Sequence, residues 1–152
     1  MKIETLKDVL HWTVNLHRRL ARYLARYEDR VHDERAGLLL DFLEQHENRL
    51  AQVVSRFEES ASDQALHTWC YEYFEKNPVL LEQIDGTDYD TADIQSVMSR
   101  IIDQHNQVIE LYRYLHAQAG AASAKELLQS LITLEEHEAM QMVMGNNRLQ
   151  DV

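Results

Sequence analysis

Four stretches of the chain place apolar residues at alternating steps of three and four, which is the spacing of one face of an α-helix. They predict helices over about 5–29, 33–59, 92–119 and 123–145. The segment between the second and third stretches, about 60–91, lacks this spacing and is long enough to run the length of a bundle. The pattern predicts an all-α fold, a single-domain up-down four-helix bundle with a long crossover between its second and third helices.

Histidines interrupt two of the apolar stripes at matching depth. His17 stands in the middle of the first stripe, and His105 stands in the middle of the third. The first stripe consists of Leu6, Leu10, Thr13, His17, Leu20, Leu24, Tyr27 and Val31. The third consists of Ile94, Met98, Ile101, His105, Val108, Tyr112 and Leu115. Both histidines are therefore predicted to point into the core of the bundle.

The second and fourth helices each contain the sequence Leu-Glu-x-His-Glu, once at 43–47 and once at 134–138. The final glutamate of each copy, Glu47 or Glu138, falls in or beside the apolar stripe of its helix. Adjacent residues lie about 100° apart around a helix, so the histidine and the glutamate of one copy cannot both point straight inward. Glu47 and Glu138 are the strongest inward candidates in the repeat.

The other members of the repeat leave two ligand sets open. In the fourth helix the apolar arc favours Glu135 over His137. In the second helix it favours His46 over Glu44. One set combines His17 and His105 with two pairs at i, i+3 spacing, Glu44/Glu47 and Glu135/Glu138. The other set consists of His17, His46, Glu47, His105, His137 and Glu138.

Burial explains why these residue types indicate a metal. An unpaired carboxylate or imidazole in an apolar core costs several kcal/mol or loses its charge. A divalent cation solves this problem, because it pairs with carboxylates and accepts the lone pairs of imidazoles. Facing helices of a bundle are an established place for such ligands.

Composition narrows the class of protein further. A net charge of −11 argues against nucleic acid as a partner, because binding it requires a basic surface. The single cysteine excludes an intrachain disulfide and fits a reducing compartment. Without a signal peptide or an apolar run of about 20 residues, the chain is expected to be cytoplasmic and not membrane-bound. The aromatic residues of the crossover favour a homodimer interface. They are Trp69, Tyr71, Tyr73 and Phe74.

The layout of helices and the Leu-Glu-x-His-Glu copies resemble the ferritin-like superfamily, which includes ferritins, bacterioferritins and rubrerythrins. The resemblance implies a bundle with one long crossover and a dinuclear iron or manganese site, with zinc as a further candidate. The family pattern has a glutamate on the first and third helices and Glu-x-x-His on the second and fourth. Here His17 and His105 stand where the family has glutamates. In one alignment carboxylates fill the second and fourth helices. In the other, His46 and His137 match the family histidines, and Leu43 and Leu134 stand where the bridging glutamates belong.

Three functional hypotheses follow from this reading. The first is a dinuclear metal protein, a non-haem di-iron oxidoreductase that reacts with oxygen or peroxide, or a protein that handles iron. The second is a metal sensor without turnover. The third is a metal-free bundle that serves as a dimeric structural or interaction module.

Overall fold

Four long helices account for most of the chain in the computed structural model, which describes residues 3–70 and 93–150. A fifth, short helix follows the second long one. The helices are α1 (Leu6–Glu28), α2 (Glu34–Ser60), α3 (Asp63–Leu66), α6 (Ile94–Gln118) and α7 (Ala122–Gln150). The predicted all-α fold is confirmed.

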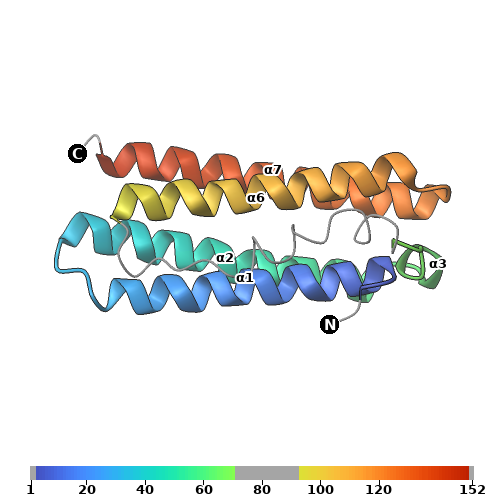
Figure 1. The fold of residues 1–152 in the computed structure, drawn as a ribbon, viewed down its shortest axis with the longest axis horizontal. Helices are drawn as coiled ribbons and strands as arrows, with labels where there is room; N and C mark the ends of the chain where they lie inside the picture. The colour runs from blue at the N-terminus through green and yellow to red at the C-terminus, as the bar shows by residue number, and fades with distance from the viewer. Residues whose placement is uncertain (1–2, 71–92, 151–152) are drawn as a thin grey trace.

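The long helices pack as two antiparallel pairs in an up-down arrangement. Helix α1 packs against α2, α6 packs against α7, and α2 joins the two pairs by packing against α7 (Figure 1). The figure also shows that α2 and α6 run in the same direction, so a long connection separates them. This topology confirms the predicted crossover between the second and third long helices.

The helix ends follow from local side-chain chemistry. Thr5 caps α1 through its hydroxyl, which accepts from the backbone N–H of Asp8, while the Asp8 carboxylate accepts from the backbone N–H of Thr5. This capping box satisfies amide groups that the first helical turn leaves free. At α6 the cap is Asp93, whose carboxylate accepts from the backbone N–H of Ser96. The third long helix therefore begins at Ile94, two residues later than predicted.

Only the first part of the predicted crossover falls within the described residues. Ser62 caps α3, and the backbone beyond α3 then pairs with the start of the chain. Leu6 N–H donates to the carbonyl of Thr68 at 2.9 Å, and Cys70 N–H donates to the carbonyl of Glu4 at 2.7 Å. Trp69 is 61% exposed. Tyr71, Tyr73 and Phe74, the other residues of the predicted dimer interface, lie outside the described residues.

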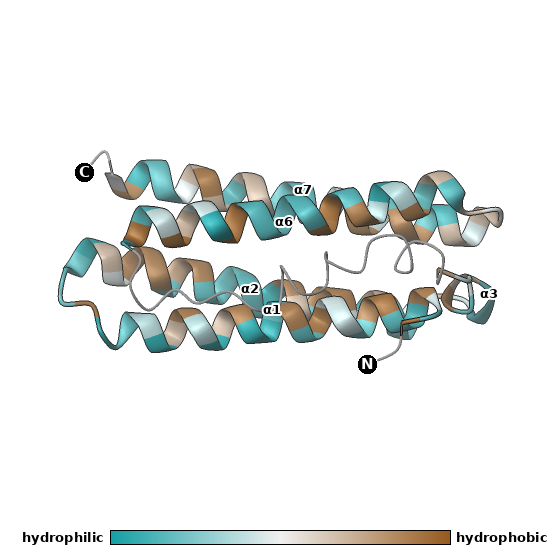
Figure 2. Cartoon of the chain, in the orientation of Figure 1, coloured by the Kyte–Doolittle hydropathy of each residue, from teal (hydrophilic) through white to brown (hydrophobic). Residues whose placement is uncertain are grey.

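The core is a continuous set of leucine, isoleucine and valine side chains contributed by all four long helices. Figure 2 shows hydrophobic and hydrophilic residues interleaved along each of these helices, as expected for helices with one buried face. Within the described part of the chain, none of the helices has the length and apolar character that a membrane span requires.

The predicted end of the fourth long helix, near 145, is wrong. Helix α7 continues through Gly145 to Gln150. Glycine is the weakest helix former after proline, which is why the sequence suggested an end here. Gly145 instead makes room for a neighbouring helix, because a Cβ at this position would lie 2.4 Å from Cε1 and Cζ of Phe42 on α2.

This contact predicts that the effect of Gly145→Ala depends on Phe42. In the wild type, Gly145→Ala is expected to lower the free energy of unfolding by about 1 kcal/mol, because the Phe42 ring must move. In a Phe42→Ala background the obstruction is absent, and the same substitution is expected to stabilise by about 0.5–1 kcal/mol through helix propensity. Urea denaturation of the four proteins measures both effects, and an effect of the same sign in both backgrounds would contradict the packing.

Candidate metal centre

Two histidines and two glutamates form a closed ring at the centre of the bundle, here called the His/Glu ring (His17, Glu47, His105 and Glu135). His17 lies 2.7 Å from Glu47 through Nδ1 and 2.7 Å from Glu135 through Nε2. His105 lies 2.5 Å from Glu47 through Nε2 and 3.2 Å from Glu135 through Nδ1. Each histidine thus contacts both glutamates, and each carboxylate uses both of its oxygens.

Each long helix contributes one member of the ring. His17 comes from α1, Glu47 from α2, His105 from α6 and Glu135 from α7. All four side chains are buried, with exposures of 0–1%. The imidazole rings lie beside each other with centroids 5.2 Å apart, and the two carboxylates close the ring at its two ends. The apolar stripes of the four helices therefore bring their ionisable members to one point.

The hydrogen bonds of the ring are consistent with one charged arrangement in the absence of a metal. With both glutamates ionised, every carboxylate oxygen accepts and both nitrogens of each histidine donate. Each histidine is then an imidazolium cation, each glutamate is an anion, and the ring is neutral. Four charge-assisted hydrogen bonds satisfy groups that would otherwise be costly to bury.

The pKa values of the ring move in the directions that this arrangement requires. Burial lowers the pKa of both histidines, but the two carboxylates outweigh burial and raise the pKa to about 9 for His17 and about 10 for His105. Burial raises the pKa of Glu135, but the histidines outweigh it and lower the value to about 2. The pKa of Glu47 is lowered by the same balance. The metal-free ring is therefore fully charged at neutral pH.

A second His–Glu pair lies beside the ring, here called the outer pair (His46 and Glu138). His46 Nδ1 lies 2.5 Å from Oε2 of Glu138, and this contact joins α2 to α7. The Glu138 side chain is 2% exposed and the His46 side chain is 16% exposed. The predicted burial of Glu138 is confirmed, but its hydrogen-bond partner is His46 and not a ring histidine.

The remaining candidates of the sequence analysis, Glu44 and His137, are not members of the ring. Glu44 is half-buried and lies in an acidic group with Glu28 and Asp41. His137 is exposed on α7. The ring contains four of the six residues of the first predicted ligand set and three of the six residues of the second.

The structure also corrects the alignment of the internal repeat. Glu47 follows His17 by 30 residues, and Glu135 follows His105 by the same 30 residues. Glu47 is thus the counterpart of Glu135, whereas the two Leu-Glu-x-His-Glu copies align it with Glu138. The equal His-to-Glu spacing is the sequence signal that singles out Glu135.

A buried tyrosine packs close to the ring. Tyr112, two turns after His105 on α6, donates from its hydroxyl to Thr13 Oγ1 at 2.9 Å, and Thr13 in turn donates to the carbonyl of Val9 at 3.0 Å. Burial and the nearby Glu135 carboxylate raise the pKa of Tyr112 well above its ordinary value. The phenol therefore stays protonated and links α6 to α1 beside the ring.

The donor set of the ring fits a metal ion. One donor atom from each of His17, His105 and Glu135 lies within 4.8 Å of the other two. Imidazole nitrogens and carboxylate oxygens together suit iron, manganese and zinc. The buried His/Glu cluster can therefore hold a metal ion.

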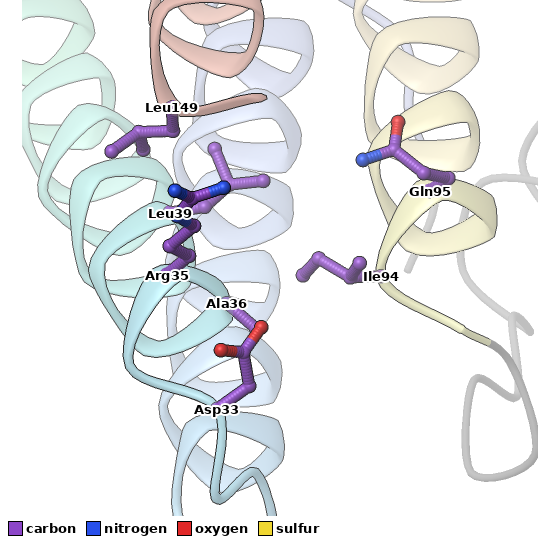
Figure 3. A pocket seen from close by; sticks show the side chains of 7 residues that line it. All are labelled: Asp33, Arg35, Ala36, Leu39, Ile94, Gln95 and Leu149. Carbon is purple, nitrogen blue, oxygen red and sulfur yellow. The ribbon is translucent and has the colours of Figure 1, made fainter. Parts of the chain in front are cut away.

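The pocket shown in Figure 3 belongs to a different part of the molecule. It has a volume of about 220 Å³ and lies where α2 and α6 begin and α7 ends. Its walls are Asp33, Arg35, Ala36, Leu39, Ile94, Gln95 and Leu149. None of these residues belongs to the His/Glu ring or to the outer pair.

Comparison with protein-family models, curated proteins and solved structures finds no match to this chain. The interpretation of the ring therefore depends on its own geometry and chemistry.

Proposed function

We propose that the protein binds iron or manganese in the His/Glu ring, in the manner of a ferritin-like bundle. The observation that carries this proposal is the burial of two imidazoles and two carboxylates at one point, one from each long helix. Such a neutral array is seldom retained for stability alone, because apolar residues of similar size often stabilise a core as well or better. Metal binding would explain why four ionisable side chains occupy these core positions.

The hydrogen bonds of the ring suggest how an ion is held. His17 Nε2, His105 Nδ1 and a Glu135 oxygen would hold an ion at the Glu135 end, once the histidines had given up the protons on those nitrogens. The opposite nitrogens of both histidines still donate to Glu47. Glu47 then orients both imidazoles and strengthens them as ligands, a role that carboxylates commonly have around metal sites.

This donor set favours iron among the candidates. Two histidines and one carboxylate, with positions left open, are the ligands of many non-haem ferrous enzymes. Zinc also accepts this set in catalytic sites, and manganese accepts its oxygen donors. When bound, iron would supply the capacity to react with oxygen or peroxide, which the four side chains lack by themselves.

The number of ions is part of the proposal. When both neutral imidazoles bind with their single lone pairs at the Glu135 end, the ring serves one ion. The dinuclear centre implied by the ferritin-like resemblance needs further carboxylates at the second ion. The nearest candidates are Glu138 and Glu44, whose side chains have other neighbours in this structure.

Metal content and thermal stability test the proposal together. Protein purified without chelator is expected to carry iron, manganese or zinc, and chelator-treated protein is expected to rebind ferrous iron or Mn²⁺ under anaerobic conditions. An ion present at 100 times its dissociation constant should raise the free energy of unfolding by about 2.7 kcal/mol, seen as a higher melting temperature. His17→Ala should abolish this rise.

The control is His137→Ala, because His137 is an exposed histidine on the helix that carries Glu135. This variant should bind metal like the wild type. The proposal would be refuted if the wild-type protein took up none of the three metals and its melting temperature were unchanged by both chelator and added metal.

A metal-free structural module is the second candidate, and one observation favours it. Every nitrogen and oxygen of the ring already has a hydrogen-bond partner within the ring. In this case the four side chains hold the two helix pairs in register, and no ion is required. The same metal titration separates the two functions, because only a metal-free module would bind no metal and show no change in melting temperature.

A further inference from the structure

An ion that binds the His/Glu ring must reach a site that is closed to solvent. The four ring side chains have exposures of 0–1%. A hydrated cation cannot cross an apolar helix interface at reasonable cost unless donor groups replace its water along the way. A series of donor atoms between the surface and the ring would therefore mark a path for the ion.

The outer pair supplies such donor atoms. His46 is the neighbour of Glu47 on α2, and Glu138 lies one turn after Glu135 on α7. Residues at i and i+3 are neighbours on a helix surface, so the Glu138 carboxylate stands next to that of Glu135. The His46 side chain is partly exposed, at 16%, so the outer pair extends from solvent towards the Glu135 carboxylate of the ring.

A positive group already approaches the outer pair from the surface. Arg49, whose side chain is 67% exposed, places Nε 3.7 Å from Oε1 of Glu138. Oε2 of the same carboxylate contacts His46. A cation arriving from solvent can therefore reach Glu138 by displacing an exposed arginine, and the net charge of −11 favours its approach.

Packing holds the outer pair in place. The ring of Phe42 lies 4.3 Å from the ring of His46, centroid to centroid, at an interplanar angle of 55°. Phe42 fits against helix α7 only because residue 145 has no side chain. This packing limits the positions open to the imidazole.

We propose that His46 and Glu138 form a transient entry site for divalent metal ions, from which an ion passes to the His/Glu ring. The inference rests on the proposed function of the ring. A transient site is not part of the final complex, so its loss slows both binding and release. A permanent ligand behaves differently, because its loss speeds release.

The test measures both rates with Co²⁺, whose visible absorption reports its binding to nitrogen and oxygen ligands. Metal-free protein is mixed with Co²⁺ in a stopped-flow instrument, and the loaded protein is then mixed with excess EDTA. Glu138→Gln is expected to slow uptake at least about tenfold, the scale of electrostatic focusing of ions. Release into EDTA is expected to slow as well, and the final amount of bound Co²⁺ is expected to stay the same.

Two further variants complete the experiment. His46→Gln, at the more exposed member of the pair, is expected to slow both rates in the same way and replaces Glu138→Gln if that variant does not fold. Glu136→Gln is the matched control, since it removes an exposed glutamate of α7 outside the ring and the outer pair. Its uptake and release should match the wild type.

The outcomes separate the inference from the function on which it rests. Faster release from Glu138→Gln and His46→Gln would overturn the inference by making the outer pair permanent ligands. Wild-type rates of uptake and release in both variants would also overturn the inference, because the outer pair would then take no part in metal entry. A wild-type protein that binds no Co²⁺, iron, manganese or zinc would instead refute metal binding itself.

Discussion

Glu47→Gln is expected to lower the free energy of unfolding of the metal-free protein by about 3–5 kcal/mol, the cost of removing one partner from a buried ion pair. Glutamine keeps the size of the side chain but removes the charge that faces both His17 and His105. One imidazole must then lose its proton or stay charged without compensation in the core. Urea denaturation in the presence of chelator measures the loss.

Two further variants show whether the loss of stability comes from an unpaired charge in the ring. Glu136→Gln changes an exposed glutamate beside Glu135 whose partner is the exposed Arg113, so its effect should stay below about 1 kcal/mol. Replacing all four ring residues by leucine or methionine should leave stability unchanged or raise it by about 1–4 kcal/mol, while metal binding is lost. A cost below about 1 kcal/mol for Glu47→Gln would contradict a charged ring.

The stability of the metal-free protein is expected to depend on pH through the ring. The pKa of each histidine rises from 6.5 to about 9 or 10 on folding, so this contribution is complete below pH 6.5 and disappears as the pH rises through 9 to 10. The pKa of Glu135 falls from 4.5 to about 2, so its contribution is complete above pH 4.5 and disappears as the pH falls through about 2. The ring should therefore stabilise the metal-free fold most between pH 4.5 and 6.5.

The metal affinity of the ring should increase at alkaline pH, where the ring's contribution to the stability of the metal-free protein decreases. An ion competes with one proton on each histidine, so about two protons should be released per ion at pH 7. Calorimetric titrations in buffers of different ionisation enthalpy count these protons. Affinity should accordingly rise with pH over the range in which the ring by itself begins to weaken. A titration that releases no protons would place the ion outside the ring.

The sequence was sufficient to predict the helices and their topology because the relevant signals are local. The apolar stripes, the capping box at Thr5 and the long interruption after α2 each report on neighbouring residues. The end of α7 was misjudged because the reason for Gly145 lies on another helix, where the Phe42 ring fills the space of a side chain. No local pattern contains that information.

The site was predicted only in part for a similar reason. His17 and His105 stand in the middle of their stripes and Glu47 stands in or beside its stripe, so periodicity alone placed them in the core. Glu135 and Glu138 are both buried on α7, and periodicity cannot decide which of them faces a histidine. That choice depends on how far α7 is shifted along its neighbours, which only the packed bundle determines.

The central claim is that the His/Glu ring binds a metal, and anomalous X-ray diffraction from crystals soaked in ferrous iron or Mn²⁺ tests it most directly. The account predicts an anomalous peak about 2.0–2.2 Å from His17 Nε2, His105 Nδ1 and a Glu135 oxygen, with Glu47 accepting from the opposite nitrogens. Soaked crystals in which all four His–Glu hydrogen bonds persist, with no anomalous peak among these atoms, would contradict it.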